Sequence, residues 1–484
     1  MKIQGVPDQN PMLNHVVLER IFKLVEFDTK TFANFRLVCT QWNETSITTW
    51  RKNTWLSVTT NREYKGIHVE DFLQLLKSPE HRFADAPFRK YIISRWCGVA
   101  RNHEGEIPEV VEFWKTVGSL MTHLSIRFTN FIFRGSLRNV VVMFIPNLRF
   151  LELSKNHYMS QKWWEIEEMD TKYLHMVNKN LTQLKFNFED EAYKYSPITY
   201  VSNMLEHFPN IQILEMTHFD RTVATVNLID IFTIMRYIRE VRGPDYFQNL
   251  AELRLLKLDE KYRAEFTLKL ASLITEHKFP LRVLTLDVGS ETELEHAKEA
   301  LQKVLEGHAA TLQELVLARE VESFSFPDFP FGIQFPNLTK FSTTGKLVQN
   351  LEFLNNMPNL EFLDLEQDAE EIQLEENFRS DSIVFEKMKQ FKITNKFCSR
   401  KQISTLGKMM PNLTSIAIGF KTSSGLRTAF NIWKNLMYVN IYTGNIDEDR
   451  FWKSKDAEKY MKDNICNATN LKQLKIGEFV KYGE

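Results

Sequence analysis

Cysteine, glycine and proline are all scarce in this 484-residue chain, which contains 4, 17 and 15 of them. The cysteines stand far apart and form no CxxC pair. They therefore indicate reduced, mostly buried thiols, and neither a disulfide framework nor a zinc site of common spacing. The low glycine and proline content argues against long disordered linkers.

The chain also lacks an excess of charge of either sign and has no long hydrophobic run. Its 61 basic and 62 acidic residues give a net charge of −1, whereas nucleic-acid binders usually carry a basic excess. The longest apolar run, VVVMFI at 140–145, is too short to span a bilayer, and no signal-peptide segment opens the chain. We expect an intracellular protein of the cytoplasm, the nucleus or both, with no nucleic-acid or membrane partner and no strong sign of homo-oligomers.

The motifs of the common enzyme classes are missing as well. We find no Walker-type phosphate loop, no GxSxG, no HExxH and no dinucleotide-binding GxGxxG. The 12 histidines are scattered, and none pairs with cysteine at zinc spacing. We therefore expect a non-catalytic protein that needs neither a cofactor nor a metal.

What the chain does contain is a recurring phrase, LxxLxL with any apolar residue at the L positions, often introduced by Pro-Asn. Clear copies are PNLRFLEL at 146–153, PNIQILEM at 209–216, PNLEFLDL at 358–365 and PNLTSIAI at 411–418. From the copy at 121 to that at 471 there are twelve intervals over 350 residues, about 29 residues each. A weaker copy starts at Phe88.

The phrase suits a short strand, because alternate residues of a strand point the same way. Between the phrases lie segments of helical periodicity, of which 291–308 is the clearest. Over residues 88–484 the chain resembles the leucine-rich-repeat family. The resemblance implies an α/β solenoid with parallel strands on the concave side and helices on the convex side.

The residue between the last two apolar positions of each phrase is expected to point away from the core. In chain order this row is Ser125, Glu152, Lys185, Glu215, Lys257, Thr285, Val316, Ser342, Asp364, Lys392, Ala417, Asn440 and Lys475. Its mixed charge suits a protein–protein surface and does not suit a phosphate-tracking groove. Any solvated sheet would look the same.

Residues 13–44, LNHVVLERIFKLVEFDTKTFANFRLVCTQWNE, lie outside the repeats and carry more apolar residues than a helical unit of about 40 residues can bury by itself. The excess must cover another part of the chain or another protein. Ile21-Phe22, the acidic turn at Asp28, and Val38-Cys39 with Trp42 three residues beyond resemble an F-box.

The F-box resemblance implies docking onto the Skp adaptor of a cullin-based SCF ubiquitin ligase. The residues expected at that contact are Leu13, Val17, Leu18, Ile21, Phe22, Val25, Leu37, Val38, Cys39 and Trp42. The alternative is that these residues pack only on the first repeat.

Three irregular stretches are candidates for binding a protein substrate. They are the phenylalanine- and proline-rich segment 322–337, the acidic segment 366–377, and segment 161–169, which holds Trp163 and Trp164. The residues singled out are Phe324, Phe326, Phe329, Phe331, Asp364 and Glu366. A loop folded onto the core, or a solvated acidic face, would explain them equally.

The sequence thus predicts a short tail at 1–12, a three-helix F-box at 13–52, a junction with irregular first repeats at 53–120 and a solenoid at 121–484. The expected function is substrate recognition in an SCF ubiquitin ligase, with an unknown protein as substrate. Three alternatives stay open: a repeat scaffold outside ubiquitination, a receptor gated by a small molecule, and an enzyme without a known motif.

Overall fold

The computed structural model of the chain describes the following residues: 15–24, 38–60, 62, 65–78, 88–94, 108–127, 137–154, 177–187, 205–217, 230–256, 263–277, 279–287, 294–318, 332–344, 351–366, 384–420, 423–443 and 470–478. The chain divides into two compact units, residues 1–248 and residues 249–484. No helix in the described ranges has the length and apolar character that crossing a membrane requires.

Unit 1 begins with two helices and continues as a series of strands and helices. Its helices are α1 (His15–Leu24), α3 (Thr40–Asn53), α4 (Val69–Lys77), α5 (Pro108–Val117), the 3-10 turn η3 (Gly118–Leu120), α6 (Leu137–Phe144) and α8 (Asp230–Arg242). Its strands are β1 (Trp55–Thr59), β2 (Ile67–His68), β3 (Lys90–Ser94), β4 (His123–Arg127), β5 (Phe150–Ser154), β6 (Gln183–Asn187) and β7 (Ile213–Thr217).

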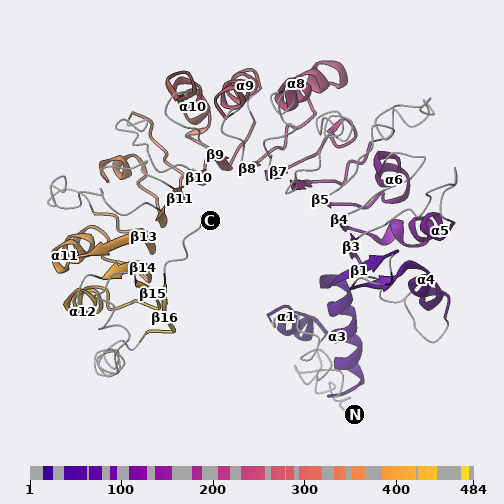
Figure 1. Cartoon of the computed structure of the whole chain (residues 1–484), viewed down its shortest axis with the longest axis horizontal. Helices are drawn as coiled ribbons and strands as arrows, with labels where there is room; N and C mark the ends of the chain where they lie inside the picture. Colours follow the sequence, from indigo (N-terminus) through magenta and orange to yellow (C-terminus); the bar gives the residue numbers. More distant parts are fainter. Residues whose placement is uncertain are drawn as a thin grey trace, which may run out of the picture. The chain divides into compact units, whose positions relative to one another are not determined.

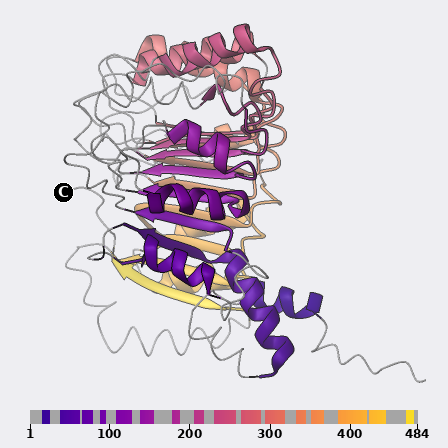
Figure 2. The same ribbon diagram turned by 90° about the vertical axis from the view of Figure 1, so that its right-hand side faces the viewer.

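All strands of unit 1 that pair do so in parallel, in the spatial order β2-β1-β3-β4-β5-β6-β7. The register is constant, so Ser125 of β4 lies beside Glu152 of β5, and Glu152 lies beside Lys185 of β6. Helices α4, α5 and α6 cover one face of this sheet (Figure 1), and Figure 2 shows them in front of the stacked strands. The uncovered face is called the open face below.

Unit 2 repeats the same plan. Its helices are α9 (Arg263–Glu276), α10 (Leu294–His308), the 3-10 turn η9 (Glu352–Asn356), α11 (Arg400–Met409) and α12 (Ser423–Ile432). Its strands are β8 (Glu252–Leu256), β9 (Val283–Asp287), β10 (Glu314–Ala318), β11 (Lys340–Thr344), β12 (Phe362–Glu366), β13 (Gln390–Cys398), β14 (Ser415–Phe420), β15 (Tyr438–Thr443) and β16 (Gln473–Glu478).

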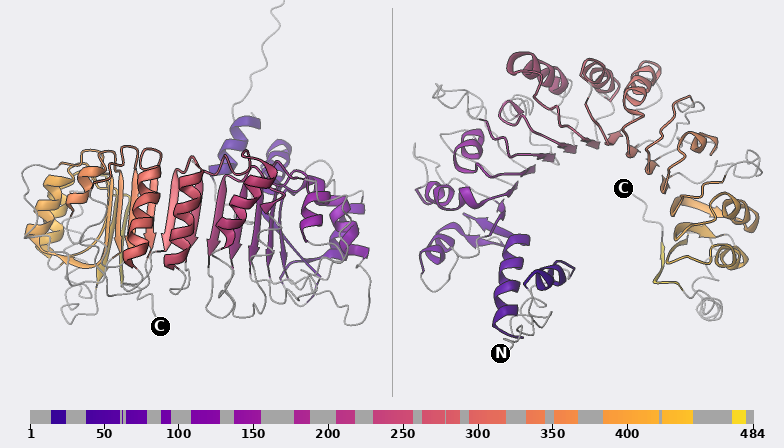
Figure 3. Two further views of the ribbon diagram at one scale, coloured as in Figure 1. Left: turned by 90° about the horizontal axis from the view of Figure 1, so that it is seen from above. Right: turned by 180° about the vertical axis from the view of Figure 1, so that it is seen from behind.

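The strands of unit 2 pair in parallel in chain order, from β8 to β16. Helices α9 to α12 again lie along one face and leave the other open (Figure 3). Each unit is therefore an α/β solenoid of the leucine-rich-repeat type, as the phrase spacing predicts.

The apolar positions of the phrase build the core between the strands and the helices. Leu148 and Leu151 are completely buried, and Leu153 is almost so. Burying such a side chain stabilises the fold by about 1.5–3 kcal/mol, so each repeat adds a similar increment at the same place. The core is continuous within each unit because successive phrases stack their apolar positions on one another.

The asparagine that directly precedes the first apolar position of a phrase ties one repeat to the next. The side-chain amide of Asn180 donates to the carbonyl of Pro146 at 2.8 Å, and that of Asn210 donates to the carbonyl of Lys179 at 2.8 Å. In unit 2, Asn337 donates to the carbonyl of Ala310 at 2.7 Å. These bonds satisfy turn carbonyls that no strand partner reaches, which explains why asparagine recurs there.

The helices follow from local signals in the sequence. In α10 the residues Ala300, Leu301, Val304 and Leu305 are buried at helical spacing. Helix α11 begins with a capping box in which the Ser399 hydroxyl accepts from the Gln402 backbone and the Gln402 side chain accepts from the Ser399 backbone.

Every phrase from residue 121 to residue 471 lies at a strand, and the weak copy at Phe88 forms β3. For one strand, β8, the phrase that starts at Leu253 predicts a register three residues too late. In NLAELRLLKL the core residues are Leu250, Leu253 and Leu255, so Arg254 pairs in the outward row beside Thr285. Lys257, predicted at that place, lies outside the described residues. The parallel ladder also begins earlier than the clear phrases, at Trp55 of β1.

Candidate protein-interaction surfaces

Helices α1 and α3 form a small helical pair at the start of unit 1. Leu18 and Phe22 of α1 are completely buried, and Ile21, Trp42 and Trp50 pack against them with part of their surface exposed. The rings of Phe22 and Trp42 meet edge to face with centroids 5.5 Å apart. Leu18 and Phe22 therefore hold the two helices together and present no surface to a partner.

Helix α3 joins the helical pair to the first repeat without a linker. It ends at Asn53, where the Thr54 amide donates to the Trp50 carbonyl at 2.7 Å, and β1 starts at the next residue. The Trp50 ring meets Phe88 edge to face at 5.6 Å, and the Arg51 guanidinium lies 5.8 Å from the centre of the same ring. This packing fixes α3 against the solenoid.

The remaining residues predicted at the adaptor contact are distributed unevenly. Val38, in the turn before α3, has 58% of its surface exposed, and Cys39 and Trp42 are half-buried. Leu13, Val25 and Leu37 lie outside the described residues, as does the side chain of Val17. Val38 is thus the most exposed apolar member of the predicted contact for which the structure describes a side chain.

The open face of unit 1 carries a connected set of charges in its outward row. The Ser125 hydroxyl donates to Glu152 Oε2 at 2.6 Å, and Arg127 Nη2 donates to the same oxygen at 3.2 Å. Lys185 Nζ lies 2.8 Å from Glu215 Oε1 and 3.9 Å from Glu152 Oε1. Both carboxylates are therefore neutralised within the sheet, and a partner would meet a polar surface of balanced charge.

The open face of unit 2 contains ion pairs between neighbouring strands. Lys392 Nζ is 2.8 Å from Asp364 Oδ2, and Lys340 Nζ is 2.8 Å from Glu314 Oε1 while lying 5.4 Å from the Phe362 ring centre. Burial raises the pKa of Asp364, and the hydrogen bond and charge of Lys392 oppose that rise. The Asp364 carboxylate is therefore paired with Lys392 of the neighbouring strand β13.

The other residues predicted to bind a substrate are not placed by the structure. Phe324, Phe326, Phe329 and Phe331 lie outside the described residues, and Glu366 is the last residue of β12 with its side chain outside them. Their role stays a prediction. Within the described ranges, no three His, Cys, Asp or Glu side chains gather in a way that could hold a metal ion.

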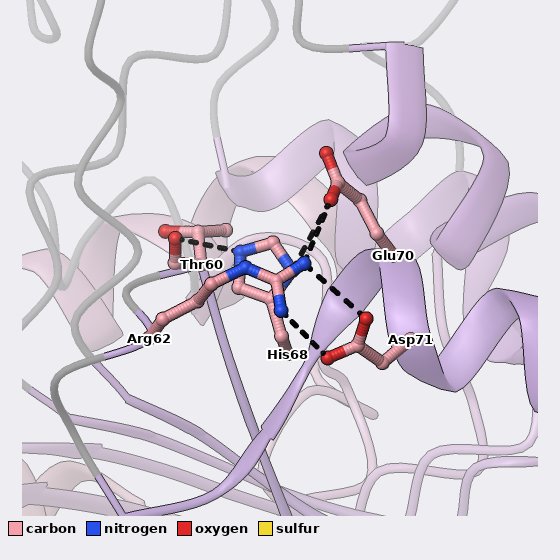
Figure 4. Close-up of polar contacts among 5 residues, drawn as sticks. All are labelled: Thr60, Arg62, His68, Glu70 and Asp71. Carbon is pink, nitrogen blue, oxygen red and sulfur yellow. Dashed lines mark hydrogen bonds and ion pairs between the residues drawn. The ribbon is translucent and has the colours of Figure 1, made fainter.

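The outer edge of unit 1 is closed by an ion-pair cluster around β2 (Figure 4). Arg62 binds Asp71 through both carboxylate oxygens, at 3.1 and 3.2 Å, and reaches Glu70 at 3.2 Å. His68 Nε2 lies 3.0 Å from the Thr60 carbonyl and so donates to it. Charged side chains at a short edge strand discourage pairing with a second sheet, so we assign this cluster a structural role.

Comparison with known proteins gives likeness in structure and none in sequence. No family model matches the chain, and no curated protein matches it in sequence. The chain resembles a solved structure of the Rad7 and Elc1 complex in yeast, at 12% identity and a TM-score of 0.36, covering 90% of this chain and 94% of that one. Similarity at this level assigns no function to the chain.

Proposed function

We propose that this chain is the substrate-recognition subunit of an SCF-type ubiquitin ligase. Its α1–α3 pair would bind the Skp adaptor and, through it, a cullin, inside the cell. The repeats would bind the protein to be ubiquitinated. The observation that carries the proposal is the helical pair α1–α3, which begins in the stretch with F-box resemblance and leaves the apolar side chain of Val38 exposed.

The short, well-packed connection between α3 and β1 suits such a role. A receptor of this kind does no bond chemistry. It raises the effective concentration of a substrate lysine near an activated ubiquitin. That gain depends on a fixed geometry between the adaptor and the substrate surface. The contacts of Trp50 and Arg51 with Phe88 supply a stiff connection at this point.

Adaptor binding tests the first half of the proposal. The full chain is titrated with purified Skp adaptor by calorimetry, beside the variants Val38→Glu and Val384→Glu. Both valines are 58% exposed, so the second is a matched control in unit 2. We expect Val38→Glu to weaken binding at least about tenfold, because burying a charge without a partner in an interface is costly, and Val384→Glu to bind normally. Equal binding by all three chains would refute the assignment of Val38.

Recruitment of a cullin separates the ligase from a repeat scaffold. The wild-type chain is captured from cell extract and its bound proteins are identified by mass spectrometry. A ligase receptor retains both the adaptor and a cullin, and loses both with Val38→Glu. Adaptor without cullin would contradict the ligase proposal and favour the scaffold.

A further inference from the structure

Three aromatic side chains gather on the open face of unit 1. They lie in a different row of the sheet from the charged residues Glu152, Lys185 and Glu215 described above. They are Trp55 of β1, His123 of β4 and Phe150 of β5, here called the aromatic cluster. Their ring centroids lie 6.0 Å apart for Trp55–His123, 5.9 Å for Trp55–Phe150 and 5.8 Å for His123–Phe150. All three residues are half-buried, so each ring keeps an accessible surface.

The register explains how residues so far apart in sequence meet. Trp55 pairs with Lys90, Lys90 with His123, and His123 with Phe150. Strands stand about 4.8 Å apart, so three steps separate the backbones of Trp55 and Phe150 by roughly 14 Å. The two ring centroids are only 5.9 Å apart. The side chains of Trp55 and Phe150 therefore lean toward one another across β3 and β4.

Two positive charges border the aromatic cluster. Lys90 belongs to the same row of the sheet, and Arg149 immediately precedes Phe150. Burial chiefly, and then the charges of Lys90 and Arg149, lower the pKa of His123 to about 4. His123 is therefore neutral at physiological pH, and its Nδ1 lies 2.9 Å from the Thr122 hydroxyl.

These cations differ from the others on the same face. Arg127 and Lys185 have carboxylate partners in the sheet. Among the residues for which the structure gives side chains, no carboxylate within 4 Å pairs with Lys90 or Arg149. A surface with half-buried rings and cations that have no carboxylate partner among the described side chains favours a ligand that brings both an apolar group and negative charge.

We propose that the aromatic cluster, with Lys90 and Arg149, binds an acidic peptide segment of a partner protein. An aromatic side chain of the peptide packs on the rings of Trp55 and Phe150. Anionic groups beside it, carboxylates or phosphorylated residues, pair with Lys90 and Arg149. That this partner is a ubiquitination substrate rests on the function proposed above, whereas the binding chemistry does not.

A peptide fits this surface better than a nucleic acid does. Glu152 lies two residues after Phe150 on the same strand face, and Glu215 belongs to the same outward row two strands further along. That row pairs its carboxylates with cations and therefore offers no continuous basic stripe, which a phosphate backbone needs. The net charge of the chain, −1, offers no long-range attraction for one either.

Fluorescence anisotropy with labelled twelve-residue peptides tests the proposal on the full chain. The reference peptide carries a central Phe flanked by Glu on both sides. Three others replace Phe by Ala, Glu by phosphoserine, or Glu by Lys, and a single-stranded RNA of similar length is the fifth probe. We expect binding of the Glu or the phosphoserine peptide at least about tenfold tighter than of the Ala and Lys peptides. The tighter of the two identifies the source of the negative charge.

Variants locate the site. Lys90→Glu combined with Arg149→Glu should weaken the anionic peptides at least about tenfold and should strengthen the Lys peptide. Phe150→Ala should remove the preference for Phe over Ala. The control is Lys115→Glu, a single charge reversal at an exposed position of α5, on the helical face.

Three results would overturn the proposal: no anionic peptide binding above the Lys peptide, unchanged binding in the Lys90/Arg149 variant with an unaltered melting temperature, or tighter binding of RNA than of any peptide. Adaptor binding is measured on the same protein samples. If the anionic peptides bind and the adaptor does not, the ligase proposal fails while this site stands. If the adaptor binds and the anionic peptides do not, the peptide site alone is refuted.

Discussion

Removing the Phe22 ring should detach helix α1 while leaving the solenoid folded. Phe22 is completely buried in the contact with α3, and its ring meets Trp42 edge to face at 5.5 Å. Phe→Ala in a core costs about 3–5 kcal/mol. A helical unit of about 40 residues has little stability of its own, so this loss is comparable with everything that holds α1 in place.

Helix α3 should respond differently from α1. Its far end is anchored on the first repeat, because Trp50 contacts Phe88 and the helix continues directly into β1. We therefore expect Phe22→Ala to abolish protection of the α1 amides and to lower that of the first turns of α3. The last turns of α3 and the strands should keep their protection.

Hydrogen exchange followed by mass spectrometry measures this directly. Peptides from 15–24 and from 48–59 are compared in the wild-type chain, in Phe22→Ala and in a control, Tyr237→Ala, whose aromatic side chain is 57% exposed. Exposed substitutions usually change stability by less than about 0.5 kcal/mol, so the control should match the wild type. Unchanged α1 protection in Phe22→Ala, or loss of the whole solenoid's thermal transition, would refute the reasoning.

Three further predictions concern the repeats. Asn210→Ala removes the bond to the Lys179 carbonyl and should cost about 1 kcal/mol, measured by urea denaturation, whereas a cost near zero would contradict the asparagine ladder. Gly118→Ala would place a methyl group against the Phe144 carbonyl, so we expect a loss of about 1–3 kcal/mol and a lower urea midpoint. Burial lowers the pKa of His308 from 6.5 to about 4, so the unfolded chain binds its proton first. The free energy of unfolding should therefore fall as the pH drops from 6.5 towards 4, by on the order of 2 kcal/mol more in the wild type than in His308→Gln. An equal dependence of the free energy of unfolding on pH in the two chains would contradict this role of His308.

The sequence was most informative where a single periodic signal decided the structure. The spacing of the apolar triplets predicted the strands and their outward row, because a two-residue alternation fixes which side chains are buried. It failed where two overlapping patterns were equally good. In NLAELRLLKL both Leu250–Leu255 and Leu253–Leu258 satisfy the phrase, and only packing against the neighbouring repeats selects the first.

The first strand was missed for a different reason. Trp55 to Thr59 carries no full phrase, since the position that should begin it is Asn53, the last residue of α3. The strand forms because β3 offers it a parallel edge. That information is tertiary, and no local pattern contains it.

For the candidate sites, the sequence located segments better than it assigned faces. The resemblance places Leu18 and Phe22 among the residues expected at the adaptor contact, whereas the structure buries both inside the helical pair. The aromatic cluster was missed because only the central residue of each phrase was considered. The residue two positions earlier points to the same face, and inspecting that row brings His123 and Phe150 together. Trp55 stays hidden to this inspection because β1 carries no full phrase.

The most direct test of the account is a comparison of three captures from cell extract, with wild-type chain, Val38→Glu, and Lys90→Glu combined with Arg149→Glu. The account predicts a double dissociation measured by quantitative mass spectrometry. Val38→Glu loses the adaptor and the cullin but keeps the other partners, and the Lys90/Arg149 variant keeps the adaptor and the cullin but loses partners with acidic, aromatic segments. If both variants lose both groups, or if neither loses any, the separation into an adaptor-binding helical pair and a substrate-binding open face is wrong.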